Sequence, residues 1–149
     1  MTHDDRILIE DCISMLGRCL DERDFDGLRN LCTEDVTVST PGGVATGHDA
    51  IVEQARQGHS HDDGIQHVIT NMLVDVDGDQ ASVRANLLVC FARTGPEDPQ
   101  PFLLGEVYRI AVRRTVDGWR IATLGSTPVW SLNLAARQAL VSPATRSAS

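Results

Sequence analysis

The sequence predicts an α+β domain in which helices come first and pack on one side of a curved sheet of antiparallel strands. Apolar residues recur at helical spacing near the N-terminus, and from about residue 65 long strand-like runs follow one another with short turns between them. The chain has 149 residues, of which 42% are hydrophobic and 23% charged, as in a single globular domain. It holds no internal repeat and no linker, so we expect one domain over 1–133.

The N-terminal helix has the strongest pattern. Asp4 and Asp5 supply an N-cap and favourable charges for the helix dipole. The apolar residues that follow form one stripe: Ile9, Cys12, Ile13, Leu16, Cys19 and Leu20. A second, short helix is expected to begin at Asp24 or Asp26, and a third over 47–58. The inward side of the second helix would hold Phe25, Leu28, Leu31 and Cys32.

A change to strand periodicity begins at Val36. The segment V-T-V-S-T predicts a strand, and the Pro-Gly-Gly turn over 41–43 leads it to a short strand over 44–46. After a polar loop over 59–64, the remaining strand-like runs cover 65–76, 80–93, 102–115 and 119–130. Asp-Gly pairs mark two of the hairpins between these runs, and a Pro-rich loop marks the third connection. Residues 134–149 favour a short helix followed by a mobile tail.

The charge balance argues against two classes of partner. Twenty-one acidic residues stand against thirteen basic ones, a net charge of −8, and such a surface repels nucleic acid and anionic lipid. All the basic residues are arginine, and the absence of lysine excludes a Schiff-base mechanism and a Walker phosphate loop. The charge is also unevenly spread, with a net −6 over 1–35 and +4 over 106–149. These ends either attract each other, in the fold or across an oligomer interface, or form solvated faces that favour solubility.

Cysteine usage favours a reducing compartment. The four cysteines lack C-x-x-C spacing, and two of them share the apolar stripe of the first helix, as buried free thiols do. They are Cys12, Cys19, Cys32 and Cys90. The chain shows no signal segment and no apolar run long enough to span a bilayer. We therefore expect a cytoplasmic protein that does not bind membranes.

Residues 59–63 match the spacing H-x-H-x-D, which two-metal hydrolases use. The ligands would be His59, His61 and Asp63. Such enzymes need further histidines downstream, but the last histidine here is His67, and Gly64 stands where another histidine is usual. A solvated loop is the better interpretation, and no metal is expected.

Three other residues allow both a structural and a functional interpretation. His67 interrupts the apolar strand I-Q-H-V-I, Asp21 closes the stripe of the first helix, and Arg109 lies within a strongly apolar strand. Taken singly, His67 fits a hydrogen-bonded core residue and Asp21 a helix-end acid. A buried Arg109 would need a carboxylate or an anionic ligand, whereas a solvent-facing one would not. No G-x-S-x-G motif and no activated cysteine suggests nucleophilic catalysis.

The order of several loose motifs resembles a known family. They are the opening amphipathic helix, D-x-x-D-F-D-G-L, D-V-T-V, I-Q-H-V-I-T-N, V-D-V-D-G-D-Q-A and D-G-W-R-I. Over about 4–132 the chain resembles the SnoaL-like branch of the nuclear transport factor 2 superfamily, and within it the scytalone dehydratase-like group. The resemblance implies a cone-shaped, strongly bent mixed or antiparallel sheet closed by three helices from the N-terminal half. A deep pocket would lie at the open end of the cone.

The resemblance also implies an acid–base pair. In that group an acid at the end of the first helix pairs with a histidine on the first long strand, and the matching residues are Asp21 and His67. Asp21 should raise the pKa of His67, while burial opposes this. Leu20, Phe91 and Arg109 replace a tyrosine, a second histidine and an asparagine of the group. We therefore expect a more apolar pocket, with Arg109 as its principal cation. Its floor would hold Leu16, Leu20, Val89, Phe91 and Trp130.

A carboxylate-held histidine removes and returns protons near neutral pH, so these expectations lead to a function. We expect a cofactor-free lyase or isomerase, a dehydratase or cyclase, acting on a hydrophobic small molecule of polyketide or aromatic secondary metabolism. One alternative is an epoxide-opening hydrolase or cyclase, which needs acids near Arg109, where the sequence offers only Glu106. Another is a non-catalytic ligand-binding protein or oxygenase small subunit, in which His67 contacts no carboxylate. A homodimer is expected because both faces of 103–112 are apolar and relatives cover the outer face with a partner.

Overall fold

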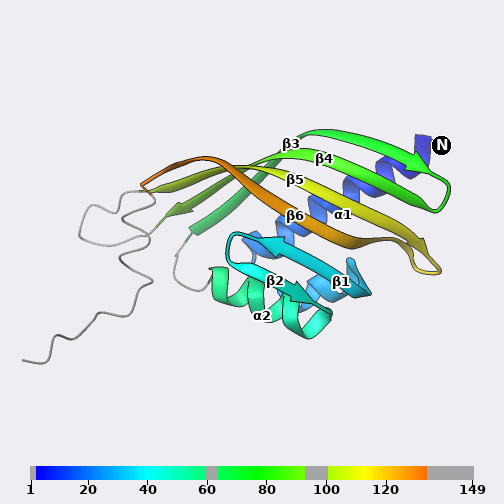
Figure 1. The fold of residues 1–149 in the computed structure, drawn as a ribbon, viewed down its shortest axis with the longest axis horizontal. Helices are drawn as coiled ribbons and strands as arrows, with labels where there is room; N and C mark the ends of the chain where they lie inside the picture. The colour runs from blue at the N-terminus through cyan, green and yellow to red at the C-terminus, as the bar shows by residue number, and fades with distance from the viewer. Residues whose placement is uncertain (1–2, 60–63, 93–100, 134–149) are drawn as a thin grey trace, which may run out of the picture.

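The computed structural model describes residues 3–59, 64–92 and 101–133. Within these ranges the helices come first and the long strands follow (Figure 1). The elements are α1 (His3–Asp21), the 3₁₀ helix η1 (Asp26–Asn30), β1 (Cys32–Thr40), β2 (Gly43–Thr46), α2 (His48–His59), β3 (Gly64–Asp77), β4 (Gln80–Ala92), β5 (Phe102–Thr115) and β6 (Gly118–Leu132). The helix expected within 134–149 lies outside the described residues. Neither of the α-helices in the described ranges is long and apolar enough to cross a bilayer.

The six strands of the described ranges form one mixed sheet in the order β2-β1-β6-β5-β4-β3. Neighbouring strands are antiparallel except β1 and β6, which run parallel. Register shifts occur in β3–β4 between Thr70 and Leu73 and in β5–β6 between Gly105 and Glu106, and such bulges bend and twist the strands. Figure 1 shows the long strands β3 to β6 curving over α1, with α2 beside β1 and β2. The predicted α+β class with a mixed sheet is confirmed.

The prediction of three helices is wrong for the second one. Over 3–59, 64–92 and 101–133 the structure has two α-helices and, between them, the five-residue 3₁₀ turn η1. The Asp24 carboxylate accepts a hydrogen bond from the Gly27 N–H at 3.1 Å and so starts this turn. Five residues are too few to stabilise an α-helix. The next residues already belong to the sheet, because the Ile121 N–H donates to the Leu31 carbonyl at 2.8 Å and Cys32 pairs with Ile121.

The hydrophobic core lies between α1 and the inner face of the sheet. Every residue of the stripe predicted for the first helix is buried, with at most 8% of its surface exposed. Along the strands, buried and more exposed side chains alternate, so that β4 buries its odd-numbered positions and β5 mainly its even-numbered ones. The largest fully buried side chains are Ile9, Ile13, Ile121, Val36, Val112 and Cys19. Burial of this continuous apolar surface holds α1 against the sheet.

Opposite charges from the two ends of the chain meet in the fold. Asp5 of α1 is buried, and its Oδ1 accepts hydrogen bonds from Arg114 at 2.9 Å and from the Trp119 indole N–H at 3.2 Å. The Arg114 guanidinium also lies 4.5 Å from the centre of the Trp119 ring. Asp35 and Arg113 form a second, exposed pair at 2.8 Å. The uneven charge left several explanations open, and attraction between the two ends within the fold is therefore one that the structure contains.

The cysteines of the described ranges are free thiols. Cys12, Cys19 and Cys32 are buried, and Cys90 is half-buried. Burial raises the pKa of the Cys12 thiol to about 11 and that of Cys32 to about 12. Because the thiolate is the reactive form, these two side chains are inert at neutral pH and contribute only to packing.

Candidate active site

An acid–histidine pair joins the end of α1 to the start of β3. Asp21 is the last residue of α1, and its Oδ1 lies 2.6 Å from His67 Nδ1. The same Oδ1 accepts a hydrogen bond from the main-chain N–H of His67 at 2.8 Å. Gly17, one turn earlier in α1, permits this close approach, because a Cβ there would lie 3.3 Å from the Ile69 side chain. The expected contact between Asp21 and His67 is thus present.

Burial and the carboxylate act on His67 in opposite directions. Only 4% of the His67 side chain is exposed, compared with 24% of the Asp21 side chain. Burial is the larger effect and lowers the pKa of His67, although the Asp21 carboxylate opposes it. Both opposing effects were expected from the sequence, and the structure shows that burial is the larger one. At neutral pH the imidazole is uncharged, and because a carboxylate only accepts hydrogen bonds, Nδ1 carries the hydrogen and Nε2 the lone pair of a base.

The pair lies between a polar cleft and a group of aromatic rings. The cleft is a hollow of about 310 Å³ between α1 and the edge strand β3, lined by Ser14, Gly17, Arg18, Asp21, Glu22, His67 and Ile69. It leaves the Asp21 carboxylate in contact with solvent. The His67 ring is also 5.4 Å from the ring of His59, which in turn lies 6.3 Å from the Phe91 ring.

Four residues expected in the pocket floor lie in the core around the pair. Val89 is the β4 partner of His67, so both side chains are on the inner face of the sheet, and Phe91 follows on the same face. Leu16 and Leu20 belong to the buried stripe of α1. All four are at most 8% exposed. Their contact with a ligand stays a prediction.

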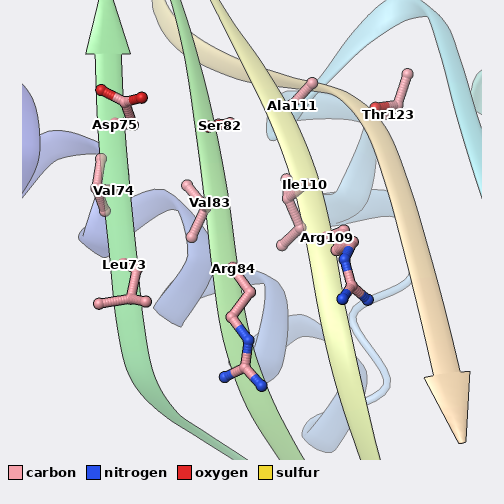
Figure 2. A pocket seen from close by; sticks show the side chains of 10 residues that line it. All are labelled: Leu73, Val74, Asp75, Ser82, Val83, Arg84, Arg109, Ile110, Ala111 and Thr123. Atoms are coloured by element: carbon pink, nitrogen blue, oxygen red, sulfur yellow. The ribbon is translucent and has the colours of Figure 1, made fainter.

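Arg109 and Trp130 are not brought together with this group. Arg109 is exposed on the outer face of the sheet, directly opposite Arg84 of β4 (Figure 2). Both arginines line a shallow hollow of about 500 Å³ on that face. Trp130 is 49% exposed, and its indole covers Gly105, which is also on the outer face. The expectation that Arg109 is the cation of the inner pocket is therefore wrong. Strand β5 directs its even-numbered residues inward, so the odd-numbered Arg109 faces outward.

Glu106 and Tyr108 are two inward-facing polar residues that the sequence interpretation did not place in the site. Glu106 is 7% exposed, accepts a hydrogen bond from the Ser126 hydroxyl at 3.3 Å, and has its pKa raised by burial. Burial also raises the pKa of Tyr108, and the charges of Glu106 and Asp21 add to the effect, so the phenol lies within electrostatic reach of both carboxylates. A signal was present for Glu106, because the other even positions over 102–112 hold Phe, Leu, Tyr, Ile and Val.

The positions of Glu106, Arg109 and Asp21 weaken both alternative functions, the epoxide-opening enzyme and the non-catalytic subunit. An epoxide-opening site needs acids near Arg109, yet Glu106 faces inward and Arg109 outward. A non-catalytic subunit was expected to leave His67 without a carboxylate, whereas Asp21 contacts it. The first alternative therefore loses its cation, and the second loses its expected feature, a His67 without a carboxylate partner.

The candidate metal motif divides between two regions. His59 is the last residue of α2 instead of a loop residue, and its Nδ1 lies 2.6 Å from the Ala55 carbonyl, to which it donates a hydrogen bond. His61 and Asp63 lie outside the described residues. Over 3–59, 64–92 and 101–133, no group of three or more histidine, cysteine or acidic side chains is arranged to hold a metal ion.

A curved mixed sheet packed on an N-terminal helix is the architecture of nuclear transport factor 2-like α+β domains. The sequence matches the family model of the SnoaL-like domain over residues 2–125, and the chain belongs to this family. No curated protein sequence matches the chain.

Several solved structures are similar to this one. A nuclear transport factor 2-like protein with a cystatin-like fold from Novosphingobium aromaticivorans is 28% identical, with a TM-score of 0.75 over 94% of this chain and 90% of that one. A protein from the same species named as a candidate scytalone dehydratase is 23% identical, with a TM-score of 0.76 over 88% and 91%. A hexachlorocyclohexane dehydrochlorinase is 20% identical, with a TM-score of 0.76 over 85% and 86%. The last two likenesses show the fold alone.

Proposed function

We propose that this protein is a cofactor-free lyase or isomerase in which Asp21 and His67 move a proton on a hydrophobic small molecule. The observation that carries the proposal is the 2.6 Å contact between Asp21 Oδ1 and His67 Nδ1 on a histidine that is almost fully buried. Such a histidine is neutral at pH 7 and holds a lone pair on Nε2, as a general base requires.

Each residue of the pair has a distinct task in the proposed reaction. His67 Nε2 takes a proton from a carbon next to a carbonyl group, and Asp21 stabilises the imidazolium that forms and holds the ring in place. The proton then goes to a leaving hydroxyl in a dehydration, or to another carbon in an isomerisation. Alternatively, the same base activates a hydroxyl for ring closure. These reactions use only groups that exchange protons, so no resident cofactor is needed.

The substrate class follows from the surroundings of the pair. Leu16, Leu20, Val89 and Phe91 provide apolar surface on the inner side of His67. A flat hydrophobic substrate with a carbonyl group, of the kind found in polyketide and aromatic secondary metabolism, matches this surface. Two proteins with similar folds carry the names of elimination enzymes, a dehydratase and a dehydrochlorinase, which is compatible with the same type of chemistry here.

The proposed function is tested by deuterium exchange. Bicyclic aromatic ketones are incubated with the protein in D₂O, and NMR follows the loss of hydrogen next to the carbonyl. We expect exchange with the wild-type chain and none above background with His67→Ala. Binding of the ketones without exchange would contradict the proposal and leave a ligand-binding protein as the better account.

We also infer that the protein acts as a homodimer in the cytoplasm. Exposed apolar side chains gather on the outer face of the sheet, on which no described helix packs: Val68, Leu88, Trp130 and Leu132. A second copy of the chain would bury this surface. Light scattering at micromolar concentration should give twice the mass of the 16.2 kDa chain, and a stable monomer would contradict the inference.

A further inference from the structure

Two arginines lie side by side on the outer face of the sheet. Arg84 of β4 and Arg109 of β5 are direct partners in the antiparallel ladder. Figure 2 shows both side chains extending in the same direction along the strands, away from Asp75 of β3. Like charges placed directly opposite each other in a sheet repel and lower its stability. The fold therefore holds two positive charges together, and a negative group that contacts both would relieve this repulsion.

Neither arginine forms an ion pair with an acid in the described ranges. Arg84 Nη1 donates to the neutral amide oxygen of Asn86 at 2.6 Å, and Arg109 lies exposed. Most other arginines of these ranges do pair with a carboxylate: Arg6, Arg18, Arg29, Arg56, Arg113 and Arg114. The chain has a net charge of −8, so acids are abundant. The unpaired state of these two guanidinium groups is therefore not caused by a shortage of carboxylates.

The hollow of about 500 Å³ on this face adjoins the two arginines. Its volume is within the range of sites for small molecules. Its lining combines apolar surface from Leu73 and Ala111 with the hydroxyl groups of Ser82 and Thr123. Asp75 is the β3 partner of Ser82 and lies about 7 Å further along the strands than the arginines. The hollow thus has a positive end, apolar surface and hydroxyl groups in one place.

We propose that Arg84 and Arg109 together bind the dianionic group of a small organic ligand, a phosphate monoester whose apolar body lies in the hollow. Planar guanidinium groups donate paired hydrogen bonds to phosphate oxygens. Two such groups side by side match two negative charges, whereas a single carboxylate neutralises only one of them. The site is on the opposite face of the sheet from Asp21 and His67. It therefore goes beyond the proposed function and does not depend on it.

The arginines are also separate from the apolar surface that we assign to the dimer. Leu88 and Trp130 of that surface are joined in one row of the ladder through Gly105. Leu88 is four residues from Arg84 along β4, a distance of about 13 Å. The proposed site therefore lies beside the dimer surface and not within it.

The first experiment varies the charge of the ligand and keeps its shape. Calorimetry at about pH 8 compares 1-naphthyl phosphate, which carries two negative charges there, with 1-naphthyl sulfate, which carries one, and with uncharged 1-naphthol. We expect the phosphate to bind about tenfold or more tightly than the sulfate, and 1-naphthol to bind more weakly still. Inorganic phosphate should bind more weakly than 1-naphthyl phosphate because it has no apolar body. Added salt should weaken binding of the phosphate.

The second experiment removes one arginine at a time. Arg84→Gln and Arg109→Gln should each weaken binding of 1-naphthyl phosphate about 10- to 100-fold, because each loses a hydrogen bond to a charged group. Arg113→Gln is the matched control, since Arg113 is an exposed arginine of the same strand whose guanidinium already pairs with Asp35 at 2.8 Å. It removes the same charge about 13 Å from Arg109, and should change the affinity by no more than about twofold.

Two further measurements locate the ligand and check the fold. In amide NMR spectra, 1-naphthyl phosphate should shift the signals of Ser82, Arg84 and Arg109. It should bind to His67→Ala as tightly as to wild type, because His67 faces the inner side of the sheet. In urea unfolding without ligand, both glutamine variants should be at least as stable as wild type, since the repulsion between the arginines is gone. Weaker binding by these variants then reports a lost contact and not a lost fold.

Several results would overturn the proposal. Absence of binding at millimolar 1-naphthyl phosphate, or equal affinity for the phosphate and the sulfate, would show that no dianion is recognised. Unchanged affinity in Arg84→Gln and Arg109→Gln, or an equal loss in Arg113→Gln, would show that the pair is not the site. Loss of binding in His67→Ala would place the ligand in the inner pocket. None of these results involves deuterium exchange, so the proposed function is tested separately.

Discussion

Replacing Asp21 with Asn separates the charge of the acid–histidine pair from its geometry. Asp21 Oδ1 accepts two hydrogen bonds from His67, at 2.6 Å from Nδ1 and at 2.8 Å from the main-chain nitrogen. Asparagine retains both only when its amide oxygen faces His67, because its amide nitrogen would meet two donors. The Asp21→Asn protein should therefore keep the ring position and the Nδ1–H tautomer, and lose only the negative charge.

The lost charge determines the size of the effect. Two unit charges about 4 Å apart attract each other by about 4 kcal/mol at the effective dielectric constant of a partly buried site. Solvent screens some of this attraction, because 24% of the Asp21 side chain is exposed. We therefore expect proton abstraction to slow by about 10²- to 10³-fold. The pKa of His67 should also fall further, since the carboxylate is the group that opposes burial.

The assay is the pH dependence of deuterium exchange between about pH 5 and 8. Asp21→Asn should lower the plateau rate and move the acid limb to lower pH. Glu22→Gln is the matched control, because Glu22 is the next residue and its exposed side chain pairs with Arg18. Denaturant unfolding should show a loss of stability of only about 1 kcal/mol in Asp21→Asn. A full exchange rate in this variant, or an acid limb that does not move, would refute the reasoning.

Three further predictions concern stability. Burial raises the Glu106 pKa above 4.5, so the folded state keeps this proton to higher pH than the unfolded state, and stability falls as pH rises between the two values. Glu106→Gln should remove that fall, and identical pH dependence in urea unfolding would contradict this. Asp5→Ala should cost about 2 to 4 kcal/mol in the same measurement, because it leaves Arg114 and the Trp119 indole without their shared acceptor. Prolonged chelation should leave the melting temperature unchanged, and a fall that Zn²⁺ reverses would restore the metal interpretation of 59–63.

The sequence by itself determined the elements that have one clear periodicity. The stripe from Ile9 to Leu20 at helical spacing identified α1 and its buried face, and Asp-Gly pairs located two hairpins. Local pattern is sufficient there, because each face of these elements has a distinct polarity. The contact of Asp21 with His67 was also predicted, since the motifs around both residues occur in the order and spacing of the family.

Only the tertiary structure decided which residues face the pair. The odd-numbered and the even-numbered residues of strand β5 are both largely apolar, so its sequence does not show which set faces the core. The position of α1 determines that Glu106 points inward and Arg109 outward. Bulges make the inner and outer positions still harder to predict from sequence, because each bulge reverses the alternation of inward and outward side chains that follows it. His59 likewise looked like a loop residue until the end of α2 placed it against His67. Such contacts join elements by packing, and packing depends on the whole sheet and not on any local pattern.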